Sequence, residues 1–83
     1  MKLARYVKFR EEKFGGVLFE TRSEKVYTLN PTASAVVKEI QAGAEASAIP
    51  GRLKERFRDD GATIEREAAS FIAQLREKGL VED

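Results

Sequence analysis

The chain has 83 residues, of which 42% are apolar and 35% are charged, with 15 basic and 14 acidic side chains. This length and composition indicate one soluble globular domain over residues 1–83, with a thin core, because a chain of this size buries only roughly 60–65% of its unfolded surface. Cysteine and histidine are both absent, which excludes disulfides, thiolate metal sites and a Ser-His-Asp relay. We therefore expect no enzymatic activity, no cofactor and no metal ion.

The hydropathy and charge patterns also restrict the compartment and the partners. No apolar run approaches the roughly 18–20 residues that cross a bilayer, and the first residues lack the apolar segment of a secretory signal. The net charge of +1 comes from interspersed signs, whereas proteins that neutralise phosphates carry clustered basic surfaces. We expect a cytoplasmic protein with neither a membrane nor a nucleic-acid partner.

The first third of the chain predicts three short strands, near residues 6–9, 17–19 and 26–29, where aromatic and β-branched residues gather. Residues 10–13 predict a charged turn between the first two strands, with Gly15 and Gly16 allowing a bend or bulge. Residues 22–25 predict the polar turn of a second hairpin. The third strand contains no proline or other blunting feature, so if it lies at a sheet edge it can accept an added strand.

A first helix is predicted from Pro31 to Gln41, with Asn30 as its N-cap and Gly43 as its stop. Its apolar residues recur at the three-four spacing of an amphipathic helix. They are Ala33, Val36, Val37 and Ile40.

Two further helices are predicted in the last third of the chain. The first covers residues 47–58, with Pro50 in its first turn and Ile49, Leu53 and Phe57 every four residues. Residues 59–61 predict a turn, after which Thr63 is the expected cap of a helix that ends at Gly79. The apolar stripe of this third helix consists of Ile64, Ala68, Phe71, Ile72 and Leu75.

Three strands followed by three helices predict an α+β, winged-helix-like fold, in which a three-stranded antiparallel sheet is covered on one side by a small helical bundle. The phenylalanines fall at positions that the strand and helix periods assign to the interior, so we expect them in the core. They are Phe9, Phe14, Phe19, Phe57 and Phe71.

Two groups of charged residues are candidate sites. The adjacent carboxylates at 11–12, 59–60 and 82–83 lie in predicted turns or at the terminus, where they cannot face each other in a dry cleft, so we interpret them as solvated. The basic residues Arg52, Lys54, Arg56 and Arg58 leave a winged-helix DNA-binding protein as an alternative. Glu55 and the following aspartates dilute this field and favour a solvated helix face.

The segment Leu29-Asn30-Pro31-Thr32-Ala33 resembles the Leu-Asn-x-Thr-Ala signature of the PqqD-like family of recognition elements for ribosomally made, modified peptides. The resemblance continues in Gly43, in the Leu53-x-x-x-Phe57 pattern and in the closing residues 79–82, and so covers nearly the whole chain. The chain departs from the pyrroloquinoline quinone subfamily in lacking tryptophan in the second strand and in the helix start at residues 49–51.

The resemblance implies a winged-helix-like peptide chaperone that binds the leader region of a precursor peptide and delivers it to a modifying enzyme. That enzyme would be of the radical S-adenosylmethionine type, and the pathway could be that of pyrroloquinoline quinone. The leader would lie along the third strand, in a groove whose other wall is the third helix. The implied peptide-binding residues are Lys25, Val26, Tyr27, Thr28, Leu29, Ala68, Phe71, Ile72 and Leu75.

On the third helix, the spacing places Phe71 and Leu75 on the core stripe and predicts that Ile72 is the apolar side chain left at the groove. We expect a monomer or weak dimer; a dimerisation module that uses the same free edge on itself is a further alternative.

Overall fold

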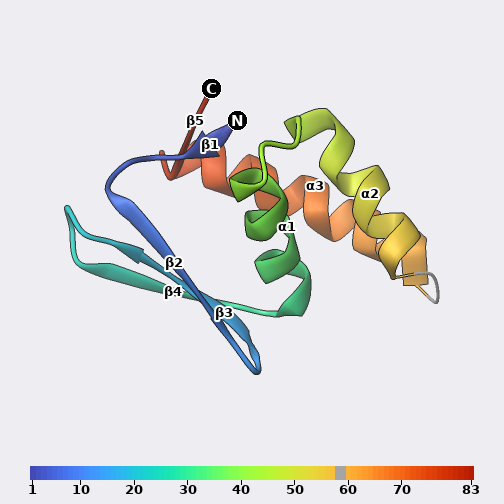
Figure 1. Ribbon diagram of the computed structural model, residues 1–83, viewed down its shortest axis with the longest axis horizontal. Coiled ribbons are helices and arrows are strands. Elements are labelled where there is room, and N and C mark those ends of the chain that lie inside the picture. Colours follow the sequence, from blue (N-terminus) through green and yellow to red (C-terminus); the bar gives the residue numbers. More distant parts are fainter. Residues whose placement is uncertain (58–59) are drawn as a thin grey trace.

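The computed structural model, which describes residues 1–57 and 60–83, has an antiparallel sheet on one side and a layer of helices on the other (Figure 1). The sheet contains β2 (Val7–Glu12), β3 (Gly15–Glu20) and β4 (Lys25–Leu29) in the order β2-β3-β4. The three predicted strands and the α+β, winged-helix-like class are confirmed. No helix within the described ranges is both long enough and apolar enough to cross a membrane.

Side-chain alternation divides the sheet into two faces. Val7, Leu18 and Leu29 are buried on the inner face, against the helices. Phe19 and Val26 are exposed on the outer face, where they lie opposite each other in the register of β3 and β4. Within the described ranges, the helices all pack on the inner side (Figure 1).

The strand β2 is longer than predicted, because residues 10–12 continue the ladder with β3 instead of forming a turn. Glu11 pairs with Gly16 and Glu12 pairs with Gly15. Gly15 has a φ of +144°, and a Cβ at this position would lie 2.2 Å from the Leu29 carbonyl oxygen. The glycine therefore allows the end of β4 to approach the start of β3 closely.

Helix α1 (Pro31–Gln41) has the predicted bounds. The Ala33 amide donates a hydrogen bond of 2.8 Å to Asn30 Oδ1, which confirms the N-cap. The chain leaves the helix through Gly43, which has a φ of +90°, as the predicted stop requires.

The helix predicted over residues 47–58 begins instead as the 3-10 turn η1 (Ala46–Ala48) and continues as α2 (Ile49–Arg56), with Pro50 in the first turn as expected. The predicted end at Arg58 and the turn residue Asp59 lie outside the described residues.

Helix α3 (Gly61–Glu77) starts three residues earlier than expected, with Asp60 at the N-cap position, so the prediction that Thr63 is the cap is wrong. Asp60 makes no side-chain capping bond, and α3 packs closely on α2, with Gly61 against Lys54. Packing rather than capping therefore sets the start of this helix.

The predicted end of α3 at Gly79 is confirmed, whereas the strand pair that follows it was not predicted from the sequence. Gly79, with a φ of +70°, ends α3, and the Leu80 amide donates a hydrogen bond of 2.9 Å to the Leu75 carbonyl oxygen. The strand β1 (Lys2–Leu3) then pairs with β5 (Val81–Glu82), so the two termini lie side by side (Figure 1).

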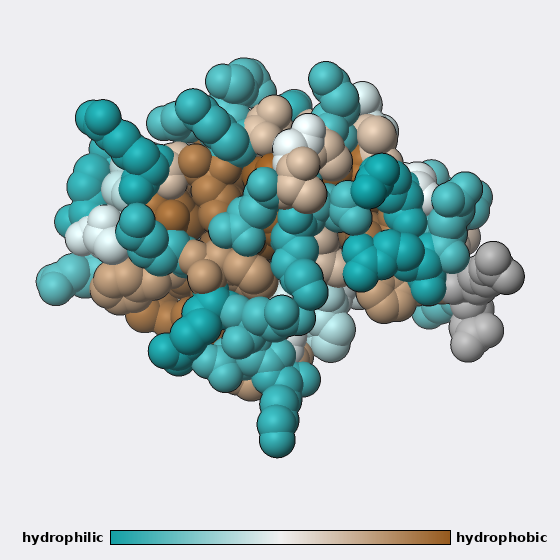
Figure 2. Space-filling view, in the orientation of Figure 1, coloured by the Kyte–Doolittle hydropathy of each residue, from teal (hydrophilic) through white to brown (hydrophobic). Residues whose placement is uncertain are grey.

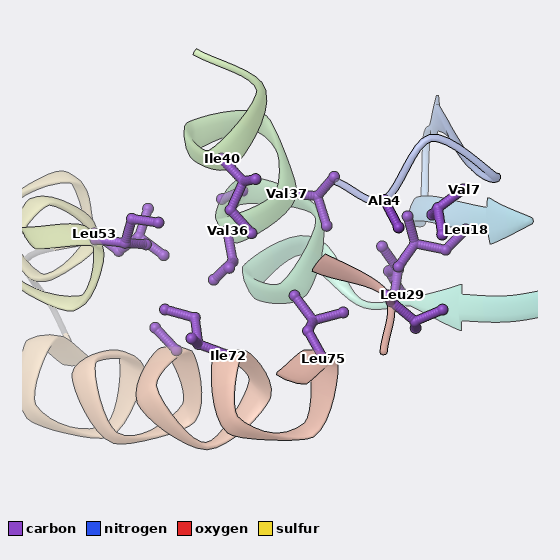
Figure 3. Close-up of a cluster of buried hydrophobic side chains, with 14 residues drawn as sticks. Ala4, Val7, Leu18, Leu29, Val36, Val37, Ile40, Leu53, Ile72 and Leu75 are labelled. Atoms are coloured by element: carbon purple, nitrogen blue, oxygen red, sulfur yellow. The ribbon is translucent and has the colours of Figure 1, made fainter. Parts of the chain in front are cut away.

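The core lies between the sheet and the helices, where aliphatic side chains from both layers meet (Figure 3). Figure 2 shows apolar side chains in this region, framed by hydrophilic ones. The expectation that all five phenylalanines are interior is wrong for Phe14, which is 53% exposed, and Phe19, which is 39% exposed. Phe14 lies in the β2–β3 turn and Phe19 points to the uncovered face, whereas Phe9, Phe57 and Phe71 are half-buried.

Candidate functional site: a free strand edge beside a groove

Strand β4 forms one edge of the three-stranded sheet. It runs in the extended sequence Lys25-Val26-Tyr27-Thr28-Leu29, which contains no proline and so retains every backbone N–H. Half of these backbone groups pair with β3, and an edge strand presents the other half as donors and acceptors for a further strand. The geometric condition for strand addition, an unblunted edge, is therefore met within the described residues.

A groove of about 480 Å³ lies between the end of β4, the start of α1 and the middle of α3. Leu29, Ala33 and Phe71 provide its apolar surface, and polar side chains provide the remainder. The complete lining is Thr28, Leu29, Asn30, Thr32, Ala33, Arg66, Glu67, Ser70, Phe71 and Gln74. The free edge and the groove are thus continuous at Thr28 and Leu29.

The helical period explains which side chains of α3 reach the groove. Ala68, Ile72 and Leu75 are 0%, 7% and 1% exposed and form the centre of the buried stripe. At about 100° per residue, Phe71 lies about 60° round from Ala68, and Gln74 lies about 120° round in the same direction. Phe71 consequently sits at the border of core and groove, where it is half-buried.

The expected positions of Phe71 and Ile72 must therefore be exchanged. Ile72 is in the core and Phe71 lines the groove. The reason is that α3 packs against both α1 and α2. The contact with α2 shifts the centre of the buried stripe toward α2, which buries Ile72 and leaves Phe71 at the border. In Figure 3, Ile72 and Leu75 both point away from α3 into the core.

The nine residues assigned from the sequence thus fall into three groups. Thr28, Leu29 and Phe71 line the groove. Lys25, Val26 and Tyr27 lie farther along the same strand edge. The remaining three, Ala68, Ile72 and Leu75, are buried beneath the groove and can only support its wall.

Sequence reasoning missed the polar lining of the groove. Glu67, Ser70 and Gln74 are spaced three and four residues apart, as one face of a helix requires, and this face adjoins Phe71. That spacing was a usable signal, because it marks a second stripe beside the core stripe. Beyond the groove, the Lys78 ammonium lies 5.8 Å from the centre of the Tyr27 ring, which joins the end of α3 to β4.

The basic residues of α2 are engaged within the fold. Arg52 Nε lies 2.7 Å from Glu39 Oε1, and an Arg56 guanidinium nitrogen lies 3.2 Å from Glu39 Oε2. Glu39 belongs to α1 and is only 7% exposed, so the two arginines hold α2 against α1. The third basic residue of this helix, Lys54, lies 3.8 Å from a carboxylate oxygen of Glu65 on α3. This pairing lowers the positive potential available to a phosphate backbone, and a DNA-binding function is not favoured.

Comparison with known sequences identifies the family. The family model described as Coenzyme PQQ synthesis protein D (PqqD) matches residues 15–81. The chain belongs to the PqqD family. This match confirms the resemblance suggested by the segment Leu29–Ala33 and includes β3, β4 and all three α-helices. No curated protein is similar enough in sequence to count as a match.

Two solved structures share the fold of this PqqD-family chain. One is described as TbiB1 in complex with the TbiA(beta) leader peptide, with a TM-score of 0.81 and 22% identity over 99% of this chain and 95% of the other. The second is described as lasso peptide synthetase B1 complexed with the leader peptide, with a TM-score of 0.78 and 23% identity over 99% and 96% of the two chains. The likeness extends over essentially the whole length of each protein.

Proposed function

We propose that this chain binds the leader region of a ribosomally synthesised precursor peptide and presents that peptide to a modifying enzyme. The observation that carries the proposal is the free edge of β4, which runs into a groove of about 480 Å³. Membership of the PqqD family supports the proposal. So does the similarity of the fold to two proteins whose structures are described as complexes with leader peptides.

In the proposed complex, the leader adds an antiparallel strand to residues Lys25–Leu29. Main-chain hydrogen bonds along β4 fix the register, and alternate leader side chains point toward the helices. Phe71, Leu29 and Ala33 provide an apolar pocket for one of these side chains, and Gln74 and Ser70 offer polar partners beside it. Affinity without catalysis is the expected property, because no step of bond making is required of this chain.

The partner enzyme is proposed to be of the radical S-adenosylmethionine type, on the family relationship alone. Holding the leader on one protein raises the effective concentration of the modifiable segment near the catalyst, provided that a second surface contacts the enzyme. This second surface must leave the edge of β4 and the groove free for the leader.

Titration of isotope-labelled protein with synthetic leader segments, taken from short reading frames found next to its gene, tests the proposal. Amide shifts are expected along Lys25–Leu29 and on the groove face of α3. Shifts confined to α2 with an unperturbed β4 would contradict strand addition. A DNA-binding function would instead give affinity that collapses between low and physiological salt, whereas strand addition depends little on salt.

A pair of proline variants tests the edge itself. Tyr27 and Thr28 are adjacent in an extended strand, so their N–H groups point to opposite sides of β4. One of Tyr27→Pro and Thr28→Pro removes a donor that β3 uses, and it should lower stability. The other removes an outward donor and should abolish peptide binding while the domain stays folded. Peptide binding that survives in every folded variant of the pair would rule out strand addition at this edge.

A further inference from the structure

The outer face of the sheet carries an apolar patch, centred on Phe19 and Val26, that lies outside the groove of the proposed leader site. The register places its side chains in two rows across the three strands. One row is Lys8, Phe19 and Val26, and the other is Arg10, Val17 and Thr28. We call these six residues the outer face.

Phe19 and Val26 are 39% and 59% exposed, although Phe19 belongs to the central strand. Together with Val17 they line a shallow hollow of about 380 Å³, to which Lys8 and Arg10 also contribute. An antiparallel sheet that faces water normally carries polar side chains on that side. Contiguous exposed apolar side chains with a polar border are typical of a protein interaction site.

The outer face is continuous with the proposed leader site. A strand that pairs with β4 becomes the fourth strand of the sheet, and each row gains one leader side chain next to Val26 or Thr28. Since successive side chains alternate, the leader residues that point outward are those that do not enter the groove. This step rests on the proposed function.

The charges on the outer face indicate which kind of protein can bind there. The β2 end of both rows is cationic, with Lys8 in one row and Arg10 in the other. Glu12 is the acidic residue of β2 on this side, and it is already paired with Arg10 at 2.6 Å. If a second copy of this chain stacked on this face, its rows could run in the same direction or in the opposite one. Lys8 would then face either the other Lys8 or the apolar end of the row at Val26, and in neither case a free carboxylate. The outer face is more complementary to a different protein, whose surface has an apolar centre and acidic residues at one side, than to a second copy of this chain.

We propose that the outer face, extended by the outward side chains of the bound leader, is the docking surface for the enzyme that acts on the same peptide. The enzyme surface that it fits has an apolar centre and carboxylates opposite Lys8. Because leader and enzyme share one continuous surface, the two bind cooperatively, and each raises the affinity of the other by the same factor.

The test uses the leader segment that binds in the titration above and a purified candidate enzyme from a neighbouring gene, and it measures the two affinities separately. Phe19→Thr combined with Val17→Thr removes apolar surface from β3, outside the leader strand β4, and places β-branched side chains that suit a strand at both positions. This double variant should bind the leader within about twofold of wild type and should lose at least about tenfold in affinity for the enzyme, as truncation at an interface centre does. Lys8→Glu should also weaken enzyme binding, whereas Lys13→Glu, in the β2–β3 turn, should not.

A scan of the leader provides an independent readout. Alanine substitution at one alternate set of leader positions should weaken leader binding, and substitution at the other set should weaken only the enzyme's affinity for the loaded domain. Enzyme affinity that is unchanged by the double variant, with leader binding intact, overturns the inference and leaves the proposed function standing. A micromolar dimer of this chain that the double variant dissolves overturns it in favour of a second copy. A leader that fails to bind the wild-type domain overturns the proposed function and the composite surface together.

Discussion

Tyr6 and Gly79 are 73 positions apart in the sequence, and the Tyr6 hydroxyl donates a hydrogen bond to the Gly79 carbonyl oxygen. The same ring is covered on one face by Arg22, whose guanidinium carbon lies 3.8 Å from the ring centre. Tyr6 therefore links three segments: the entry to β2, the β3–β4 turn and the end of α3. This contact anchors the glycine turn that leads from α3 to β5.

We expect Tyr6→Phe to lower the free energy of unfolding by about 0.5–1.5 kcal/mol, because the ring is kept and one hydrogen bond is lost. Urea denaturation measures the change. Tyr6→Leu also removes the cation–π contact and should cost about 0.5–1 kcal/mol more. A Tyr6→Phe variant as stable as wild type would show that the hydroxyl is equally well satisfied by water.

Phe71 and Ile72 form a matched pair for separating binding from stability. Ile72→Ala should cost about 2–5 kcal/mol of stability, because it leaves a cavity in the core. Phe71→Ala removes a half-buried ring from the groove wall, so it should cost less stability and at least about tenfold in leader affinity. Peptide titration together with thermal denaturation of both variants checks the assignment. If Ile72→Ala lowered leader affinity more than stability, and Phe71→Ala did the opposite, Ile72 rather than Phe71 would line the groove.

The ion-pair cluster of Glu39, Arg52 and Arg56 is expected to stabilise the α1–α2 contact without contributing to the leader site. Glu39→Gln keeps the shape of the side chain but removes its charge, and should lower stability by about 1–2 kcal/mol. Arg52→Ala should cost less, because the arginine is half-exposed and Arg56 still pairs with the carboxylate. Leader affinity should stay within twofold in both variants, and a large loss of affinity would implicate α2 in binding.

Two glycines should respond to alanine in opposite directions. Gly15→Ala introduces a Cβ 2.2 Å from the Leu29 carbonyl oxygen at a φ of +144°, and should prevent the native approach of β3 and β4. Gly51 lies in α2 with no atom within 4 Å of an added Cβ. Gly51→Ala should therefore raise stability by about 0.5–1 kcal/mol. Chemical denaturation of both proteins tests the pair.

The sequence predicts correctly the helix ends that are determined by neighbouring residues. Asn30 and Pro31 fix the start of α1, and Gly79 fixes the end of α3, because capping is decided within one turn of helix. Two-residue strands such as β1 and β5 have no period to detect. Their pairing depends on where α3 delivers residue 80, which is a property of the whole fold.

Placement of side chains on α3 and β3 was harder to predict for a different reason. The spacing of Ala68, Phe71, Ile72 and Leu75 defines a stripe but not its centre, which depends on the two helices packed against α3. In β3, alternation shows that Leu18 and Phe19 point to opposite sides, but not which side the helices cover. Hydrophobicity favoured burying Phe19, and the structure leaves it on the outer face.

The pairing of β1 with β5 has a consequence for how the domain combines with other proteins. Lys2 lies opposite Glu82, so a polypeptide joined to either end departs from the same point of the surface. A short connection therefore suffices for circular permutation and for insertion of the whole domain into a loop of a host protein. Fusion to another domain at one end is equally compatible with this geometry. Recombination between genes could therefore move this fold between free-standing and embedded forms while β4 keeps the same edge.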